Sequence, residues 1–159
     1  MTTDPAAHAL LPGYANAKAT QAYAQAHIEA GDAAEGHYSD FLRVRMRLSS
    51  LGVGTFGGSA EPAVDARIAA AVAEALIKGV NVIDTGAHYR YGRSLAAVGA
   101  GIRAAVAQGV PREAMFLMSK GGFLTCGAGR PPTWPAGSSA RSSPPVWVRA
   151  TTWPRARTC

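Results

Sequence analysis

The sequence predicts an α/β fold with parallel strands, on the basis of three observations. Residues 63–78 and 94–108 carry apolar residues at helical spacing. Short apolar runs precede, separate and follow these helices, at 51–54, 80–84 and 115–118. Strand and helix therefore alternate, which is typical of parallel strands joined by right-handed crossovers. The chain of 159 residues, 48% of them hydrophobic, is long and apolar enough for one domain with a core.

The N-terminal part of the chain is expected to hold a loose leader, a helix and a strand. Residues 1–16 contain two prolines and a glycine and are assigned to the leader. Residues 17–30 are rich in alanine, lack proline and glycine, and end before Gly31, which favours a helix. Residues 42–48 alternate apolar and basic side chains, and this period of two predicts a strand with one solvated face.

Three glycines that follow this segment match the dinucleotide fingerprint G-x-G-x-x-G, but their context favours another interpretation. In a dinucleotide-binding unit the third glycine lies at the start of the helix. Here Pro62, which suits a first helical position, comes five residues after Gly57. We therefore expect a short strand and a glycine-rich loop over 51–58. A Rossmann-type dehydrogenase fragment, with Asp84 as the ribose-binding acid, remains an alternative.

The two predicted helices each present one apolar stripe. The stripes comprise Val64, Ile68, Val72 and Leu76 in the first helix and Val98, Ile102 and Val106 in the second. Gly79 and Gly109 suit the helix ends, and Pro111 prevents the second helix from continuing.

Two of the predicted strands end on polar residues that could carry chemistry. Residues 80–83 form an apolar run that leads into Asp84, and Tyr89 follows five residues later. Residues 115–118 form a second run that leads toward Lys120. The carboxyl ends of parallel strands meet at one edge, where open sheets and barrels gather their functional groups. In the alternative without a function, Asp84 caps a turn and Tyr89 packs on the surface.

Taken together, these segments resemble the aldo-keto reductase family over roughly residues 47–123. The matching pieces are LGVGTF at 51–56, GVNVIDT at 79–85, YGRS at 91–94 and LMSKGG at 117–122, together with Tyr89 and Gly99. They occur in the order of the family and near its spacing. The resemblance implies a (β/α)₈ barrel that uses NADPH to reduce carbonyl compounds. It also implies a short N-terminal hairpin that closes the bottom of the barrel.

The resemblance assigns catalytic roles to three residues. Tyr89 is implied to be the general acid that protonates the carbonyl oxygen as hydride arrives at the carbon. A free tyrosine has a pKa of about 10, which is too high for an efficient acid near neutrality. Lys120 beside it would favour the phenolate, and Asp84 would orient and pair with the lysine.

The same resemblance assigns binding roles near the first strand. Gly54, Thr55 and Phe56 are implied to lie beside the nicotinamide and the substrate, and Asp84 also belongs to the cofactor site. Phe56 and His88 are the expected substrate-binding residues, although His88 could equally be a spacer next to the tyrosine. The expected cofactor is NADPH, the expected partner is a small-molecule carbonyl substrate, and no metal site is expected.

The sequence departs from the family pattern at two places. Leu95 follows Ser94, where members of the family usually have glutamate. The catalytic histidine of the family follows the fourth strand, and no histidine occurs after His88. The resemblance therefore supplies three parts of a four-part reductase site.

The expected fold class is α/β, a partial (β/α)₈ TIM barrel with an N-terminal hairpin and helix and a disordered tail, because a full barrel needs about 250 residues. We expect a leader and helix at 1–40, the partial barrel at 41–125 and a low-complexity Arg/Pro/Trp tail at 126–159. The tail holds six of the ten prolines and all three tryptophans, a composition that suggests out-of-frame translation of GC-rich DNA. As an incomplete fragment, the chain should bind NADPH weakly and reduce no carbonyl at a useful rate.

Charge and cysteine content narrow the remaining function classes. The net charge is +6, but no acidic residue follows Glu113 and five arginines follow residue 126, so the basicity belongs to the tail. Nucleic-acid binding is therefore not expected, although a non-catalytic binding protein that uses this basic aromatic tail is an alternative. Cys126 and Cys159 form neither a disulfide framework nor a metal-ligand spacing. With no secretory signal or long apolar run, we expect a cytoplasmic protein without a membrane span.

Overall fold

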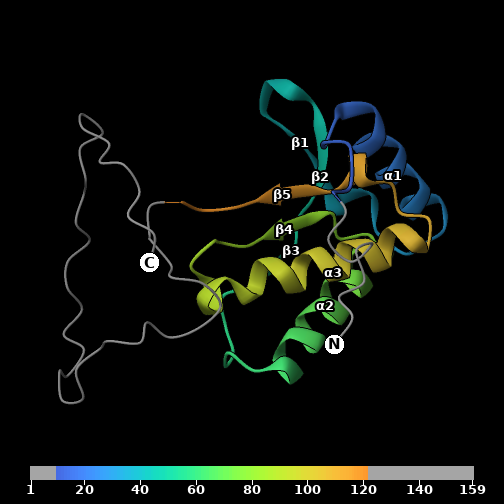
Figure 1. The fold of residues 1–159 in the computed structure, drawn as a ribbon. Helices are drawn as coiled ribbons and strands as arrows, with labels where there is room; N and C mark the ends of the chain where they lie inside the picture. The colour runs from blue at the N-terminus through green and yellow to red at the C-terminus, as the bar shows by residue number, and fades with distance from the viewer. Residues whose placement is uncertain (1–9, 122–159) are drawn as a thin grey trace, which may run out of the picture.

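A computed structural model describes residues 10–121 of the chain. In it a three-stranded sheet has two helices along one face, and a hairpin and a further helix lie at one end of the sheet (Figure 1). The start of the predicted leader, residues 122–125 of the predicted barrel and the predicted tail at 126–159 lie outside the described residues. No helix within residues 10–121 has the length and apolar character needed to cross a membrane.

The sheet is parallel, as the alternation of strands and helices predicts. It comprises β3 (Gly52–Gly54), β4 (Val82–Asp84) and β5 (Phe116–Met118), in the order β3-β4-β5. Gly54 pairs with Asp84, and Asp84 pairs with Met118, so the three carboxyl ends lie level with one another. Within the described residues these strands form an open sheet, and the partial (β/α)₈ barrel stays a prediction.

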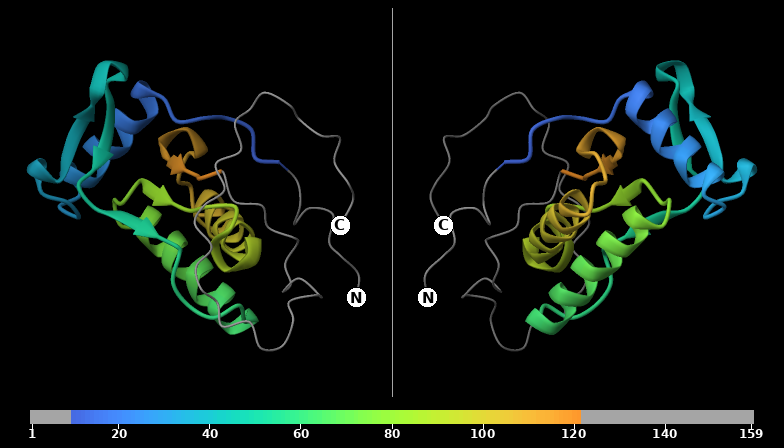
Figure 2. Two further views of the ribbon diagram at one scale, coloured as in Figure 1. Left: turned by 90° about the vertical axis from the view of Figure 1, so that its left-hand side faces the viewer. Right: turned by 90° about the vertical axis from the view of Figure 1, so that its right-hand side faces the viewer.

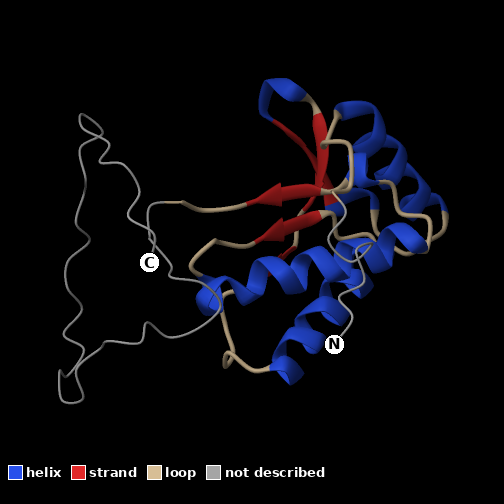
Figure 3. Cartoon of the chain, in the orientation of Figure 1, coloured by secondary structure: helices blue, strands red, loops and turns tan. Residues whose placement is uncertain are grey.

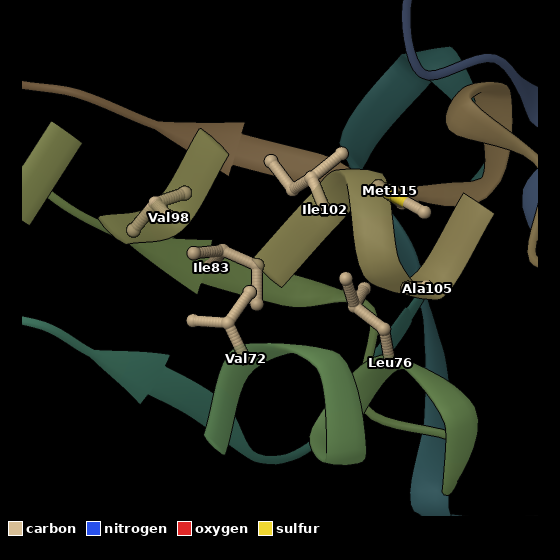
Figure 4. Packing of buried hydrophobic residues seen from close by; sticks show 7 residues of the cluster. All are labelled: Val72, Leu76, Ile83, Val98, Ile102, Ala105 and Met115. Carbon is tan, nitrogen blue, oxygen red and sulfur yellow. The ribbon is translucent and has the colours of Figure 1, made fainter. Parts of the chain in front are cut away.

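The two predicted helices are confirmed to within one residue. They are α2 (Pro62–Ile77) and α3 (Arg93–Ala107), which pack against each other and against the sheet (Figures 1 and 3). Both stripes contribute to the main core, which comprises Val72, Leu76, Ile83, Val98, Ile102, Ala105 and Met115 (Figure 4). Gly79 and Gly109 follow the helices with φ of 94° and 93°, left-handed values that favour glycine after a helix end.

The N-terminal helix is confirmed, and of the strand predicted at 42–48 only the second half is confirmed. Helix α1 spans Ala17–Glu29, and the Asn16 side chain caps it by accepting from the backbone N–H of Ala19 (2.9 Å). The predicted strand is instead the turn and second arm of an antiparallel hairpin, β1 (Tyr38–Phe41) with β2 (Met46–Ser49). The chain reverses at 42–45 because a 3₁₀ turn is followed by Arg45 at φ 53°, and pairing with β1 overrides the local alternation.

The hairpin and α1 cover the amino ends of the parallel strands (Figures 1 and 2). Asn81, which directly precedes β4, is fully buried. Its side chain accepts from the N–H of Ser49 (2.9 Å) and donates to the carbonyl oxygens of Arg47 (2.9 Å) and Ala114 (3.1 Å). One amide therefore joins β2, β4 and the segment that enters β5, at the end of the sheet where the resemblance implies a hairpin.

Candidate functional site

Two backbone hydrogen bonds beyond the strands bring the predicted catalytic residues to one place. The N–H of Thr85 donates to the carbonyl oxygen of Met118 (2.9 Å), and that of Ala87 donates to the carbonyl oxygen of Lys120 (3.3 Å). The segment after β4 therefore runs beside the segment after β5. This pairing places Lys120 next to Asp84, at the carboxyl edge of the sheet.

Lys120 is the centre of the polar contacts at this edge. Its ammonium donates to Asp84 Oδ1 and to the carbonyl oxygen of Thr85 (3.2 Å), and Nζ lies 4.9 Å from the centroid of the Tyr89 ring. The hydrogen bond to Asp84, followed by the interaction with Tyr89, raises the pKa of Lys120 above its ordinary value. The side chains of Asp84 and Lys120 are 33% and 43% exposed, so the pair lies open to a ligand.

Tyr89 lies in an aromatic cluster with the two residues predicted to bind substrate. Tyr89 is 7% exposed, and its ring meets the rings of Phe56 and His88 edge to face, at centroid distances of 5.0 and 4.8 Å. A Cβ at Gly86 would lie 3.0 Å from the Tyr89 ring, so a glycine there lets the ring approach the backbone closely. Phe56 is 69% exposed and forms the open side of the cluster.

The end of β3 completes the edge on the other side of Asp84. The N–H and hydroxyl of Thr55 both donate to the carbonyl oxygen of Asp84 (3.1 Å each), and the buried hydroxyl of Ser94 donates to the carbonyl oxygen of Thr55 (2.7 Å). Thr55 is therefore buried and used within the fold, and it supports Asp84 rather than facing a ligand. Nothing lies within 4 Å of a Cβ built on Gly54, so the surface from Gly54 to the exposed Phe56 is free for a flat ring.

Sequence reasoning missed a second polar cluster, which starts at the residue after Tyr89. The Arg90 side chain is 2% exposed, and its guanidinium reaches the start of α2, where it contacts Asp65 Oδ1 (2.6 Å). Arg93 donates to the other oxygen of Asp65. Partial burial opposes ionisation of Asp65, but hydrogen bonds from Arg93 and then Arg90 outweigh it, so the pKa of Asp65 lies below its usual value.

The backbone of this segment is strained. Arg90 and Tyr91 have φ of 51° and 60°, left-handed values that cost a non-glycine residue about 1–2 kcal/mol each. An arginine after a tyrosine is usually a solvated side chain, and neither spacing nor composition marks it as buried. The left-handed backbone at Arg90 and Tyr91 is visible only in the structure, so the sequence offers no signal for this buried arginine.

The start of α2 does not suit the pyrophosphate of a Rossmann cofactor. Glu61 occupies the N-cap without a side-chain capping bond, and Asp65 lies in the first turn. The Glu61 carboxylate would repel a diphosphate at this helix end, and the two arginines nearby are already paired with Asp65. Among residues 10–121, no group of three or more His, Cys, Asp or Glu side chains could hold a metal ion.

Comparison with protein families matches residues 50–144 to the model of the Aldo/keto reductase family. The matched range begins just before β3, includes every site residue described above, and extends into the segment for which the sequence predicts a tail. Neither the curated proteins nor the solved structures gave a match.

Proposed function

The chain belongs to the aldo/keto reductase family, and from this premise we propose that the carboxyl edge of its sheet reduces aldehydes or ketones with NADPH. Members of this family are oxidoreductases that use nicotinamide cofactors and act on carbonyl compounds. The observation that carries the proposal is the contact of Lys120 with both Asp84 and the ring of Tyr89.

In the proposed reaction Tyr89 is the general acid. Its hydroxyl gives its proton to the carbonyl oxygen of the substrate while a C–H bond forms at the carbonyl carbon. The resulting phenolate lies beside the Lys120 ammonium, which stabilises the negative charge. Asp84 holds the ammonium in place, and water returns the proton to Tyr89 after the alcohol leaves. The raised pKa of Lys120 keeps its charge across the physiological range.

The residues beside Tyr89 fit a nicotinamide ring. When bound, reduced nicotinamide supplies the hydride that adds to the carbonyl carbon. The backbone of Gly54 offers a surface without side-chain obstruction, and Asp84 lies level with Gly54 across the sheet. The exposed ring of Phe56 shields one side of the reacting carbon from water, and His88 borders the substrate on the other side of Tyr89.

We further propose that turnover by this chain is slow. The family places a histidine after its fourth strand, and the sequence contains no histidine after His88. Tyr89 then protonates the substrate without that histidine to orient the carbonyl, which lowers the rate through loss of positioning.

A transfer assay with tritium at C4 of NADPH tests this function at slow turnover. The full chain is incubated with the labelled cofactor and benzaldehyde, and tritium in benzyl alcohol is counted. Tyr89→Phe keeps the ring and removes the proton, so we expect about 100-fold less label in the alcohol. Label transfer that is absent from the wild type, or equal in Tyr89→Phe, would overturn the proposal.

A further inference from the structure

The Arg90 side chain joins the segment after β4 to the loop between β3 and α2. Its Nε and Nη2 donate to the carbonyl oxygen of Ser59 (2.9 and 2.7 Å). Nη2 also donates to the carbonyl oxygen of Glu61 (3.3 Å) and to Asp65 Oδ1 (2.6 Å). The loop that precedes α2 is therefore fastened to the residue next to Tyr89.

An arginine at position 90 is energetically unfavourable in its backbone conformation and in the burial of its charge, which suggests that the link has a function. Its backbone is left-handed, which a glycine would adopt without strain. Its charge is almost completely buried, and Nη1 has no hydrogen-bond partner. Strained backbone of this kind persists where the surrounding contacts hold it, and it gathers at functional sites.

The linked loop also carries Phe56, which lies three residues before Ser59. Phe56 packs against one edge of the Tyr89 ring (5.0 Å between centroids), and Lys120 lies against the same ring (4.9 Å). Tyr89 thus contacts Phe56, the loop connects Phe56 to Ser59, and Ser59 is hydrogen-bonded to Arg90, the neighbour of Tyr89 in the chain.

We propose that Arg90 is a positioning residue that holds the Tyr89 ring between Phe56 and Lys120 by tying the loop before α2 to the segment after β4. The proposal rests on the proposed role of Tyr89 as the acid. Asp65 supports the link by receiving the Arg90 guanidinium. Arg93 also pairs with Asp65 but donates to neither the Ser59 nor the Glu61 carbonyl oxygen, so it does not join the loop to the segment of Tyr89.

Tyrosine-specific NMR of the full chain tests the proposal without relying on turnover. The chain is labelled with ¹³C on its tyrosine rings, and the Tyr89 signal is identified by its loss in Tyr89→Phe. Packing against Phe56 and His88 gives this signal a ring-current shift. Tyr23 and Tyr38, at the opposite edge of the sheet, report whether the rest of the fold is intact.

Arg90→Gly removes the guanidinium and leaves a residue that adopts the left-handed backbone freely. We expect the Tyr89 signal to lose most of its ring-current shift while the Tyr23 and Tyr38 signals stay in place. The matched control Arg93→Gln removes a second ion pair with Asp65 and should leave the Tyr89 signal unmoved. Asp65→Asn should move the Tyr89 signal in the same direction as Arg90→Gly, by a smaller amount.

An unchanged Tyr89 signal in Arg90→Gly would overturn the proposal, and so would an equal shift in Arg93→Gln. If Arg90→Gly does not fold, Asp65→Asn decides: a shift of the Tyr89 signal supports the link, and no shift contradicts it.

In the tritium assay, Arg90→Gly should lower the rate at saturating NADPH about tenfold without changing the NADPH concentration for half-maximal rate. A wild type without label transfer would refute the reductase function and leave the NMR result standing.

Discussion

The two ends of the parallel sheet use polar residues in opposite ways. At the amino end the Asn81 side chain is fully buried and satisfied, and the hydroxyls of Tyr23 and Tyr38 donate to the carbonyl oxygens of Leu76 and Gly79. At the carboxyl end Asp84 and Lys120 are partly exposed, and the adjoining backbone is strained.

The difference indicates that polar groups at the amino end stabilise the fold, whereas those at the carboxyl end are accessible to a ligand. Polar groups that are buried and fully hydrogen-bonded specify the fold and have no capacity left for another partner. Exposed groups in contact with one another contribute little stability but remain accessible to a substrate. Barrel folds divide their strand ends in the same way, with chemistry at the carboxyl face.

The sharpest way to break this comparison is Asn81→Ala. The substitution removes the hydrogen bonds to the N–H of Ser49 and to the carbonyl oxygens of Arg47 and Ala114, and it leaves the Ser49 and Ala114 groups buried without this partner. We expect a loss of about 3 kcal/mol in the free energy of unfolding, measured by urea titration. Asp84→Ala is the matched truncation at the other end and should change stability by less than about 1 kcal/mol. Equal losses would contradict the comparison.

The second-largest effect is expected from alkaline pH, which should lower the free energy of unfolding through the tyrosines at the amino end. Burial, followed by the charge of Asp32, raises the pKa of Tyr38 to about 12, and burial raises that of Tyr23 further. Because both folded-state values lie above the unfolded value of about 10, their contribution is complete below pH 10 and is lost as the pH rises toward 12.

Unfolding followed by circular dichroism at several pH values measures this effect. The free energy of unfolding should fall steadily above pH 10, and Tyr38→Phe should flatten the decline. A decline that is equally steep in Tyr38→Phe would show that the amino end does not depend on this hydroxyl in its protonated form.

The smallest expected effect on stability belongs to Lys120→Met. The ion pair with Asp84 is exposed, so its loss should change the free energy of unfolding by less than about 1 kcal/mol. The same variant should nevertheless lose tritium transfer, because the phenolate of Tyr89 then forms without a neighbouring cation. A large loss of stability with unchanged transfer would place Lys120 among the structural residues.

Local patterns predicted the elements that enclose the core. The stripes ending at Leu76 and Val106, and the glycines after them, lie within the same short segments that they shape, so α2, α3 and the parallel strands could be predicted. The convergence of Asp84 and Lys120 could also be expected, because parallel strands align their carboxyl ends.

The features that sequence reasoning missed depend on distant partners. The turn at 42–45 follows from pairing between β1 and β2, which overrides the alternation of apolar and basic residues. In the sequence Asn81 is a single polar residue within an apolar run. Its structural role depends on hydrogen bonds to Ser49 in β2 and to Ala114, which are distant in the chain. Arg90 resembles a surface arginine until its contacts with the loop before α2 are known.

The most direct test of this division of the sheet is tritium transfer per folded molecule, measured in parallel for Tyr89→Phe and Asn81→Ala. Tyr89→Phe should unfold like the wild type and transfer about 100-fold less label. Asn81→Ala should unfold at lower urea concentration but, in the folded fraction, transfer label at the wild-type rate. If Asn81→Ala abolishes transfer in its folded fraction, or Tyr89→Phe retains it, chemistry does not belong to the carboxyl edge.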